Sequence, residues 1–170
     1  MNLLFKLSRY VLTLGLVFSA LGISTTVALA AKPTTYERPI SGTVPLSGVC
    51  SFTVFVTETG TSKVTQFFDK SGALTRIHAH NNEQDTFTAN GKTLVGIPFV
   101  SNIDVLFDSH GNITHIYSQG LLEKVPLPDG SLFVSAGRVD AINHPGAMFI
   151  LTPDNGNPGN LAGFCAALAP

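Results

Sequence analysis

From residue 52 onward, apolar and polar residues alternate in short runs, and clusters of Gly, Asn, Asp and Pro separate these runs. A period of two residues is typical of β-strands that bury one face, and the separating residue types favour tight turns. The turn clusters lie at residues 69–72, 90–91, 108–112 and 128–130. No segment from residue 31 to residue 159 has a convincing helical period. The sequence therefore predicts an all-β fold, either a single antiparallel β-barrel of a calycin-like or similar kind or a closed sandwich.

The strands are expected in nine runs: residues 52–57, 62–68, 73–80, 85–89, 92–97, 101–107, 113–118, 131–137 and 147–151. Residues 59–61 (Thr-Gly-Thr) predict a turn between the first two runs. Three prolines within residues 31–47 favour an extended N-terminal arm that leads into the domain. At the other end, Asn160 is a plausible N-cap for a short helix or coil.

One internal similarity supports a meander of hairpins. Residues 62–78 align without gaps on residues 101–117, with Phe, Asp, Gly, Thr and Ile at matching places. Both stretches are predicted to form a strand, an Asp-x-x-Gly turn and a second strand. A duplicated half-barrel explains the similarity, and so does the shared chemistry of hairpins with this type of turn.

The N-terminus has the composition of a secretory leader. Lys6 and Arg9 precede an apolar run over residues 10–23, and a small-residue Ala-Leu-Ala triplet ends before Ala31. A retained membrane anchor is the alternative, but small and polar residues interrupt the run well before the ~20 apolar residues that a spanning helix needs. We therefore expect a signal peptide at residues 1–30, the arm at 31–47 and one β domain at 48–170, in a secreted, extracellular or periplasmic protein without stable membrane insertion.

Without that leader, the chain keeps eight Lys and Arg residues against eleven Asp and Glu residues. This weak negative charge gives no electrostatic footprint for nucleic acid. The chain contains only two cysteines, Cys50 and Cys165, which bracket the patterned region. In an oxidising compartment they are expected to form one disulfide, and chain entropy gives a loop of this length about 4 to 5 kcal/mol of stabilisation.

A metal site is one functional hypothesis. Gly72, His78, His80, Asp85 and Gly91 resemble the first metal motif of cupins, in which a His-x-His pair and an acidic residue bind a metal inside a β-barrel. Here Asp replaces the Glu of that motif, the last glycine comes one residue early, and no second motif follows. The resemblance implies Zn, Fe or Mn at His78, His80 and Asp85. The alternative places both histidines on the solvent face of a strand end, and no cofactor is then expected.

Ligand binding is another hypothesis. Arg76 and Arg138 lie within predicted strands, where each could reach a carboxylate such as Asp140 or an anionic ligand in a barrel mouth. Phe55 and Phe67 belong to stretches whose two faces are both apolar, which suits a barrel lumen that holds a small hydrophobic ligand. Structural ion pairs and a packed interior explain the same residues without a ligand.

Four stretches carry a further resemblance: residues 49–52 (VCSF), 68–72 (FDKSG), 128–138 (PDGSLFVSAGR) and 163–168 (GFCAAL). Together with the leader, they resemble a group of small secreted bacterial proteins with no assigned activity. This resemblance implies an exported β-barrel-like domain and carries over no catalytic residue. The chain also lacks the sequence motifs of serine hydrolases and zinc proteases. We therefore expect a non-catalytic protein that binds a small apolar or anionic molecule, with a cupin-like metal enzyme, a barrel cyclase or isomerase, or an adhesion module as alternatives.

Overall fold

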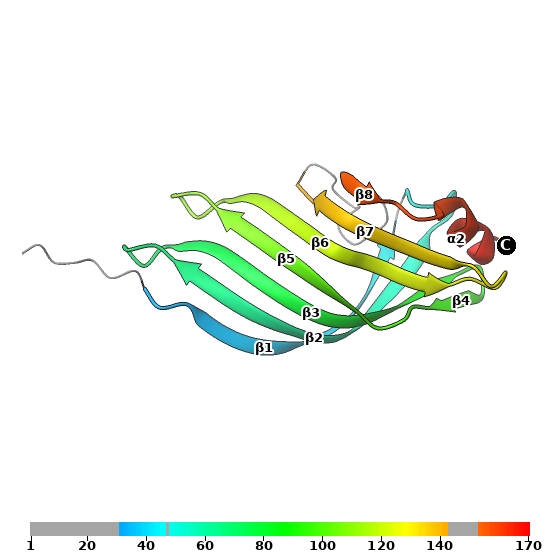
Figure 1. Cartoon of the computed structure of the whole chain (residues 1–170), viewed down its shortest axis with the longest axis horizontal. Helices are drawn as coiled ribbons and strands as arrows, with labels where there is room; N and C mark the ends of the chain where they lie inside the picture. Colours follow the sequence, from blue (N-terminus) through cyan, green and yellow to red (C-terminus); the bar gives the residue numbers. More distant parts are fainter. Residues whose placement is uncertain (1–30, 47, 143–152) are drawn as a thin grey trace, which may run out of the picture.

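A computed structural model describes residues 31–46, 48–142 and 153–170 of the chain. These residues form one antiparallel sheet and a short helix, so the predicted all-β class is confirmed (Figure 1). The elements are β1 (Thr34–Leu46), β2 (Val54–Phe68), β3 (Leu74–Ala89), β4 (Lys92–Val95), β5 (Phe99–Phe107), β6 (Ile113–Pro126), β7 (Leu132–Asp140), β8 (Asn155–Asn157) and α2 (Leu161–Leu168). The expected leader and the strand expected at residues 147–151 lie outside the described residues.

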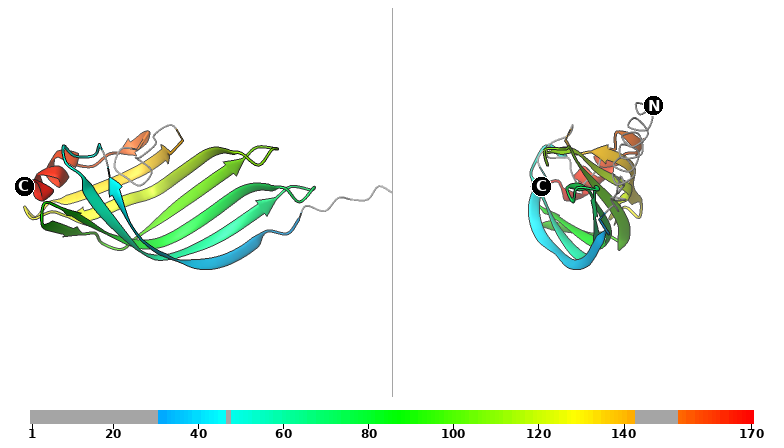
Figure 2. Two further views of the ribbon diagram at one scale, coloured as in Figure 1. Left: turned by 180° about the vertical axis from the view of Figure 1, so that it is seen from behind. Right: turned by 90° about the vertical axis from the view of Figure 1, so that its left-hand side faces the viewer.

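The sheet has eight strands in the order β1-β2-β3-β5-β6-β7-β8, and β4 pairs with β3 away from this path. Every pairing is antiparallel, as the run of predicted hairpins requires. Among the described strands, β1 and β8 stand at the two ends of this order and do not pair with each other. The hydrogen-bonded ladder is therefore open, although the strands curl strongly about a common axis (Figure 2).

The long strand β3 organises this curvature. Its N-terminal half pairs with β5 and its C-terminal end pairs with β4, while β2 runs along its other side. The segment between β4 and β5 then joins two strands that are not neighbours: Gly96 N donates to Asp85 O at 2.7 Å, and Ile97 N donates to Lys124 O at 2.8 Å. A Cβ on Gly96 would lie 2.9 Å from Asp85 O, so a glycine is required for this close approach. These bonds hold β6 against β3 and help to fold the sheet into a trough.

Two expected chain breaks do not occur. Residues 59–61 lie within β2, and the polar residues 81–84 continue β3, so four predicted strand runs merge into two long strands. The register pairs Thr59 with Gln84 and Gly60 with Glu83, so each polar stretch satisfies the backbone of the other. A Cβ on Gly60 would lie only 2.1 Å from Asn82 O. Gly60 therefore allows close contact between strands and does not form a turn.

The segment expected to be an extended arm is the edge strand β1. It pairs with β2 from Thr34 opposite Gln66 to Leu46 opposite Val54. Pro39 lies within this strand, which is compatible with an edge position because one side of an edge strand has no ladder partner. The N-terminal segment is thus extended and also part of the sheet.

The two similar hairpins have the same hydrogen bonds. Asp69 Oδ1 accepts from the backbone N–H groups two and four residues later, at 2.8 and 2.9 Å. Asp108 Oδ1 accepts from the equivalent groups of its own turn, at 2.8 and 2.9 Å. In both hairpins the ladder shifts register just before the turn. The sequence similarity therefore corresponds to a real equivalence in local structure.

One end of the sheet is closed by α2. Phe164 of α2 packs edge-on against Phe87 and tilted against Phe133, with ring centroids 5.1 Å apart in both pairs. The expected disulfide is confirmed: Cys50 and Cys165 are bonded, with their Cα atoms 5.6 Å apart. The expected N-cap is confirmed as well, because Asn160 Oδ1 accepts from Gly163 N at 3.0 Å.

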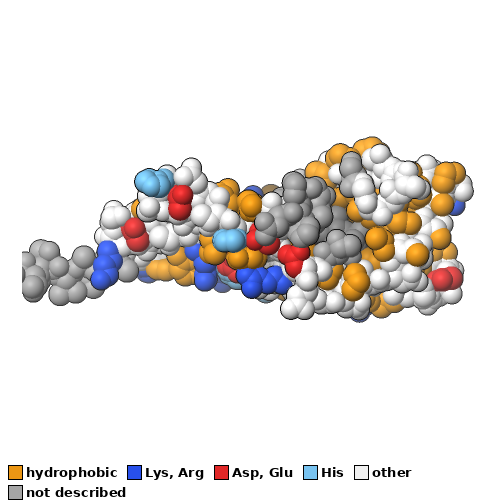
Figure 3. Space-filling model, turned by 90° about the horizontal axis from the view of Figure 1, so that it is seen from above, with side chains coloured by type: hydrophobic (Ala, Val, Ile, Leu, Met, Phe, Trp, Pro, Cys, Tyr) orange, Lys and Arg blue, Asp and Glu red, His pale blue; other side chains and the backbone are white. Residues whose placement is uncertain are grey.

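The buried apolar residues gather at this end, which we call the capped end. The cluster comprises Leu46, Val54, Val56, Phe87, Ala89, Leu94, Val125, Leu127, Phe133, Phe164 and Leu168. Charged side chains gather further along the molecule, towards the hairpin tips (Figure 3). The fold thus combines an apolar core at the capped end with a polar, half-open region along the rest of the trough.

Candidate functional site

The concave face of the sheet contains a cavity of about 320 Å³, which we call the trough cavity. Strands β1, β2, β3, β5 and β6 all contribute to its wall. Its apolar lining consists of Ile40, Phe99, Ile103, Val105, Ile116, Leu122 and Ala141. Its polar lining consists of Arg38, Glu58, Asn81, Glu83, Asp85, Ser101 and Ser118. An apolar wall with a few convergent polar groups is the usual composition of a small-molecule site.

Strand alternation places the polar groups on one patch of this wall. Asn81, Glu83 and Asp85 are alternate residues of β3, so their side chains lie on the same face of the sheet. Glu58 of β2 is the register partner of Asp85. Carboxyl groups that are direct partners on neighbouring strands repel each other when both are ionised. Simultaneous ionisation of Glu58 and Asp85 is therefore unfavourable.

A fourth carboxyl group reaches the patch from β6. The pairing of β6 with β7 shifts register between Leu121 and Glu123, and the consecutive residues Leu122 and Glu123 are both buried. A β-bulge of this kind lets two successive side chains point towards the same side. Glu123 thereby lies beside Asp85. We call Glu58, Glu83, Asp85 and Glu123 the carboxyl cluster.

Hydrogen bonding within the cluster is uneven. The Ser101 hydroxyl donates to Glu83 Oε1, and Asn81 Nδ2 donates to Ser101 Oγ at 3.3 Å. By contrast, Asp85 Oδ1 is buried without a donor in the described part of the chain, and the Glu123 carboxyl group is approached by the Asp85 carboxyl and by the Lys124 backbone N–H. Asp85 is 3% exposed and Glu123 is 1% exposed, so both carboxyl groups are shielded from bulk solvent.

The cluster is built to hold protons. Burial raises the pKa of Glu58 to about 7, and the negative charges of Asp85 and Glu83 add to this rise. Burial also raises the pKa of Glu83 and of Asp85. The pKa of Glu123 lies well above its ordinary value because of burial and because of the neighbouring Asp85 carboxyl. The facing Asp85 and Glu123 groups can hydrogen-bond to each other only when one of them carries a proton.

The histidines of the expected metal site lie on the other face of the sheet. His78 Nδ1 contacts Asp104 Oδ1 at 3.0 Å, and His80 Nδ1 contacts Asn102 Oδ1 at 2.9 Å. Asp85 lies an odd number of residues further along the same strand and therefore faces the trough. The structure does not bring the three side chains together, and no group of three His, Cys, Asp or Glu residues within the described ranges can hold a metal ion.

The two arginines expected at a ligand site also lie on the convex face. Arg76 Nε contacts Asp104 Oδ1 at 3.5 Å, and its guanidinium lies 4.4 Å from the centre of the Phe67 ring. Arg138 stacks at 3.7 Å over Tyr117. Neither arginine lines the trough cavity. Arg76 and Phe67 thus form a surface contact with each other.

Two more residues that the sequence suggested for a ligand site, Asp140 and Phe55, also lie away from the trough cavity. Asp140 pairs with His115, at 2.8 Å between Oδ2 and Nδ1, and this hydrogen bond lowers the pKa of Asp140. His115 also stacks on Tyr117 with the ring centroids 5.1 Å apart. Phe55 is 45% exposed near the capped end, where it lines a shallow surface depression with Phe52.

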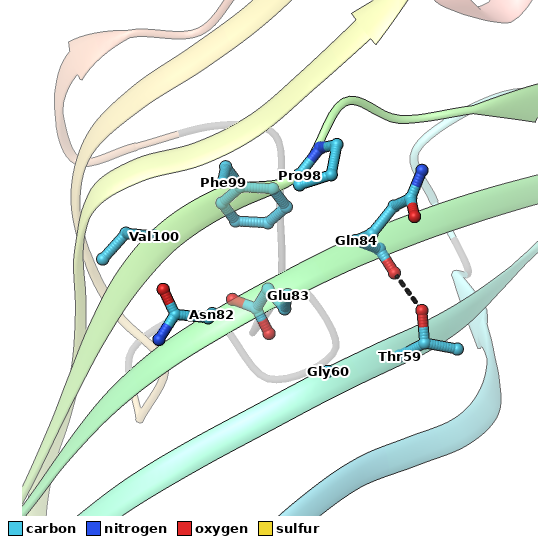
Figure 4. A pocket seen from close by; sticks show the side chains of 8 residues that line it. All are labelled: Thr59, Gly60, Asn82, Glu83, Gln84, Pro98, Phe99 and Val100. Carbon is cyan, nitrogen blue, oxygen red and sulfur yellow. Dashed lines mark hydrogen bonds between the residues drawn. The ribbon is translucent and has the colours of Figure 1, made fainter.

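A second depression lies at the start of β5, where Phe99 pairs with Glu83 of β3 (Figure 4). Its floor is formed by Gly60, which has no side chain, and Thr59 Oγ1 donates to Gln84 O at 3.0 Å beside it. Glu83 and its register partner Phe99 line this depression as well as the trough cavity. Glu83 and Phe99 therefore lie between this depression and the trough cavity.

Asp85 was expected from the sequence as a metal ligand, whereas Glu58 and Glu123 were not expected at a site. One signal was present: these acidic residues occupy strand positions whose alternate neighbours are apolar, such as Val56 before Glu58 and Val125 after Glu123. A carboxyl group at an inward position of a β-strand is unusual unless it has a partner or a function.

No family model, curated protein or solved structure matches this chain. None of the helices in the described part of the chain is long and apolar enough to cross a membrane. The fold and the site together define an antiparallel β-sheet protein with a carboxyl-lined cavity in its concave face.

Proposed function

We propose that this protein is exported and that it binds a small, mostly apolar organic molecule in the trough cavity. The observation that carries the proposal is the cavity itself: apolar side chains from opposite parts of the curled sheet, such as Ile40 of β1 and Ile116 of β6, line one space of about 320 Å³. At ~30 Å³ for each water-sized group, this space accommodates about ten of them. The side chains Ile40, Ile103 and Val105 remain partly exposed there, although closer packing would have buried them.

The shared lining also supports a barrel-like arrangement. Residues of the edge strand β1 and of β6 contribute to the same cavity, although three strands separate them in the sheet order. We take the trough cavity as the lumen of this incomplete barrel. The disulfide supports export, because such bonds persist mainly in oxidising compartments.

The carboxyl cluster disfavours the anionic ligands that the arginines suggested. Three of its members line the cavity, and among the described lining residues Arg38 alone carries a positive charge. An anion placed there would meet carboxyl groups that are already crowded, and like charges at such a distance cost binding free energy. A neutral or cationic ligand fits the wall better.

Binding can be tested with phenylbutanol, a neutral molecule of suitable size, by following its NMR signals during titration with the protein. Val105→Trp fills the cavity and should abolish binding, whereas Leu106→Trp, on the opposite face of the same strand, should leave it intact. Circular dichroism checks that both variants fold. Equal binding by both variants would overturn the proposal.

Export has its own test. Material recovered from the extracellular or periplasmic fraction should begin at or near Ala31, because the Ala-Leu-Ala triplet before it is a cleavage signal. N-terminal sequencing or intact mass measures this directly. Mature protein that retains Met1 would refute cleavage.

One observation favours acid–base catalysis of the isomerase type as a second candidate. Glu58 lines the cavity, and burial raises its pKa to about 7, where a carboxyl group can both accept and return a proton. Such a base would remove a proton α to a carbonyl group. Phenylacetone in D₂O offers a test: the protein should accelerate the loss of its α-proton NMR signal, and Glu58→Gln should not. No acceleration by the wild type would leave binding as the sole proposal.

A further inference from the structure

We propose that the ligand of the trough cavity is an amphipathic organic cation, with a charged nitrogen at the carboxyl cluster and an apolar body along β5 and β6. This inference deepens the proposed function and rests on it, because it assumes that the cavity binds a small molecule. It specifies the chemical class of the ligand and its orientation in the cavity.

The cavity has a polar end and an apolar end. Along the pairing of β3 with β5, Glu83 faces Phe99 and Asn81 faces Ser101, close to Asp85. Further along the same pairing, Ile103 faces Ala79 and Val105 faces Ile77, so the wall becomes apolar towards the hairpin tips. A molecule with one polar end and one apolar end matches this gradient.

At the polar end, one buried carboxyl oxygen has no hydrogen-bond donor. Asp85 lines the cavity, and its Oδ1 is buried with no donor in the described part of the chain. Behind it, the buried carboxyl group of Glu123 packs against that of Asp85. A protonated amine supplies up to three N–H donors and no acceptor, so it complements this surface. A hydroxyl group supplies one donor, and a carboxylate supplies none.

The charge balance of the wall points to the same ligand. Glu58, Glu83 and Asp85 line the cavity, and no lysine does so among the described residues. Arg38 lies on the exposed part of β1, opposite Ser62, and forms no ion pair with a described carboxylate. Arg38 therefore does not neutralise these carboxyl groups. A ligand cation beside them would reduce their mutual repulsion.

A metal ion would not meet the same requirements. The described residues contain no group of three His, Cys, Asp or Glu side chains arranged to hold one. The apolar wall beside the cluster would remain unfilled by a hydrated ion, whereas an organic cation covers both parts of the site.

Cation binding should depend on pH in a defined direction. Glu58 faces Asp85 and Glu83 from β3, Glu123 lies beside them from β6, and Arg38 lines the cavity from β1. Because the pKa of Glu58 is raised to about 7, this group loses its proton as the pH rises through neutrality. An alkylammonium group with a pKa of about 10 keeps its charge over this range. Its affinity should therefore increase from about pH 6 to about pH 8, while that of a neutral ligand stays constant.

Three molecules that differ only in their terminal group test the inference: phenylbutylamine, phenylbutanol and phenylbutyrate. Titration calorimetry at about pH 8 should show the amine binding about tenfold more tightly than the alcohol, and the carboxylate more weakly than both. Glu58→Gln and Asp85→Asn should each lower the affinity for the amine about tenfold and change that for the alcohol less than twofold. Glu37→Gln, an exposed change on β1, is the matched control and should leave both affinities unchanged.

The outcomes separate the two proposals. If the amine and the alcohol bind equally and Val105→Trp abolishes both, the cavity is a binding site but the cationic class is wrong. If the amine binds more tightly but Glu37→Gln weakens it as much as Glu58→Gln does, the preference comes from general charge, and the placement at the cluster is wrong. If none of the three molecules binds, the proposed function itself fails.

Discussion

The capped end and the trough of this molecule share strands β1, β2, β3 and β6, yet their inward positions have opposite chemistry. On β2, Val54 and Val56 enter the apolar core, and Glu58, the next inward residue, enters the cavity. On β3, the order is reversed, because Asp85 precedes the core residue Phe87. Strand alternation thus determines which face of the sheet a side chain is on. Whether that face is covered by another layer determines whether an inward side chain is apolar or polar. Helix α2 covers the capped end, and the described residues leave the trough open.

The largest expected difference concerns packing. Phe164→Ala removes the ring that contacts Phe87 and Phe133 and should cost about 4 kcal/mol of unfolding free energy. Val105→Ala, in the partly exposed trough wall, should cost less than about 1 kcal/mol. Urea denaturation measures both values. Similar losses for the two variants would show that the trough is packed as tightly as the core.

The disulfide is expected to act mainly on the capped end. Cys50→Ser should lower the unfolding free energy by about 4 kcal/mol, because the bond closes a long loop and ties α2 to the segment before β2. Cys165→Ser should have the same effect, and the double variant should add nothing further. Hydrogen exchange should show faster opening of α2 than of β5 in these variants. Uniform loss of protection over the whole sheet would contradict this division.

A smaller effect should appear in the pH dependence of stability. The carboxyl group of Glu58 has an ordinary pKa of 4.5 when unfolded and about 7 when folded, so the folded state binds the extra proton. Its contribution makes the protein less stable as the pH rises from about 4.5 to about 7. Glu58→Gln should remove part of this loss, whereas Glu37→Gln should not. Melting temperatures measured across this range provide the test, and identical slopes for wild type and Glu58→Gln would contradict it.

The smallest effects should come from the tips of the β2–β3 and β5–β6 hairpins, whose turns have equivalent hydrogen bonds. Asp69→Ala and Asp108→Ala remove the same pair of side-chain to backbone hydrogen bonds. Both should lower the melting temperature slightly and by similar amounts. Fluorescence-monitored thermal unfolding would detect the difference. A much larger loss for one variant would show that its hairpin makes additional contacts.

Local chemistry made several features predictable from the sequence. The Asp-x-x-Gly turns, the N-cap at Asn160 and the pairing of Cys50 with Cys165 each depend on a few residues whose side chains determine the outcome. The all-β class followed from the period of two residues. These features hold irrespective of how the sheet curls.

Other features depend on contacts between distant segments, and the sequence pattern missed them. Gly60 was interpreted as part of a turn because the close approach of Asn82 is a property of the paired strands. The second false break, at residues 81–84 of β3, obscured the site. Once β3 is continuous, simple alternation places His78 and Asp85 on opposite faces, but a break between them removes that inference. Glu123 lies beside Asp85 because of a bulge, which depends on the pairing of β6 with β7.

The position of the disulfide also determines how the molecule would respond to mechanical force. A pull applied at both chain ends would pass through the sulfur bridge and bypass β2 to β8, because Cys50 and Cys165 enclose all of these strands. Among the described strands, the load would pass along β1, which precedes Cys50 and is already almost fully extended, so its separation from β2 would add little length. The ring of covalent bonds around the trough would remain closed. The molecule would therefore hardly lengthen under load, and separation of β1 would remove Arg38 and Ile40 from the cavity wall.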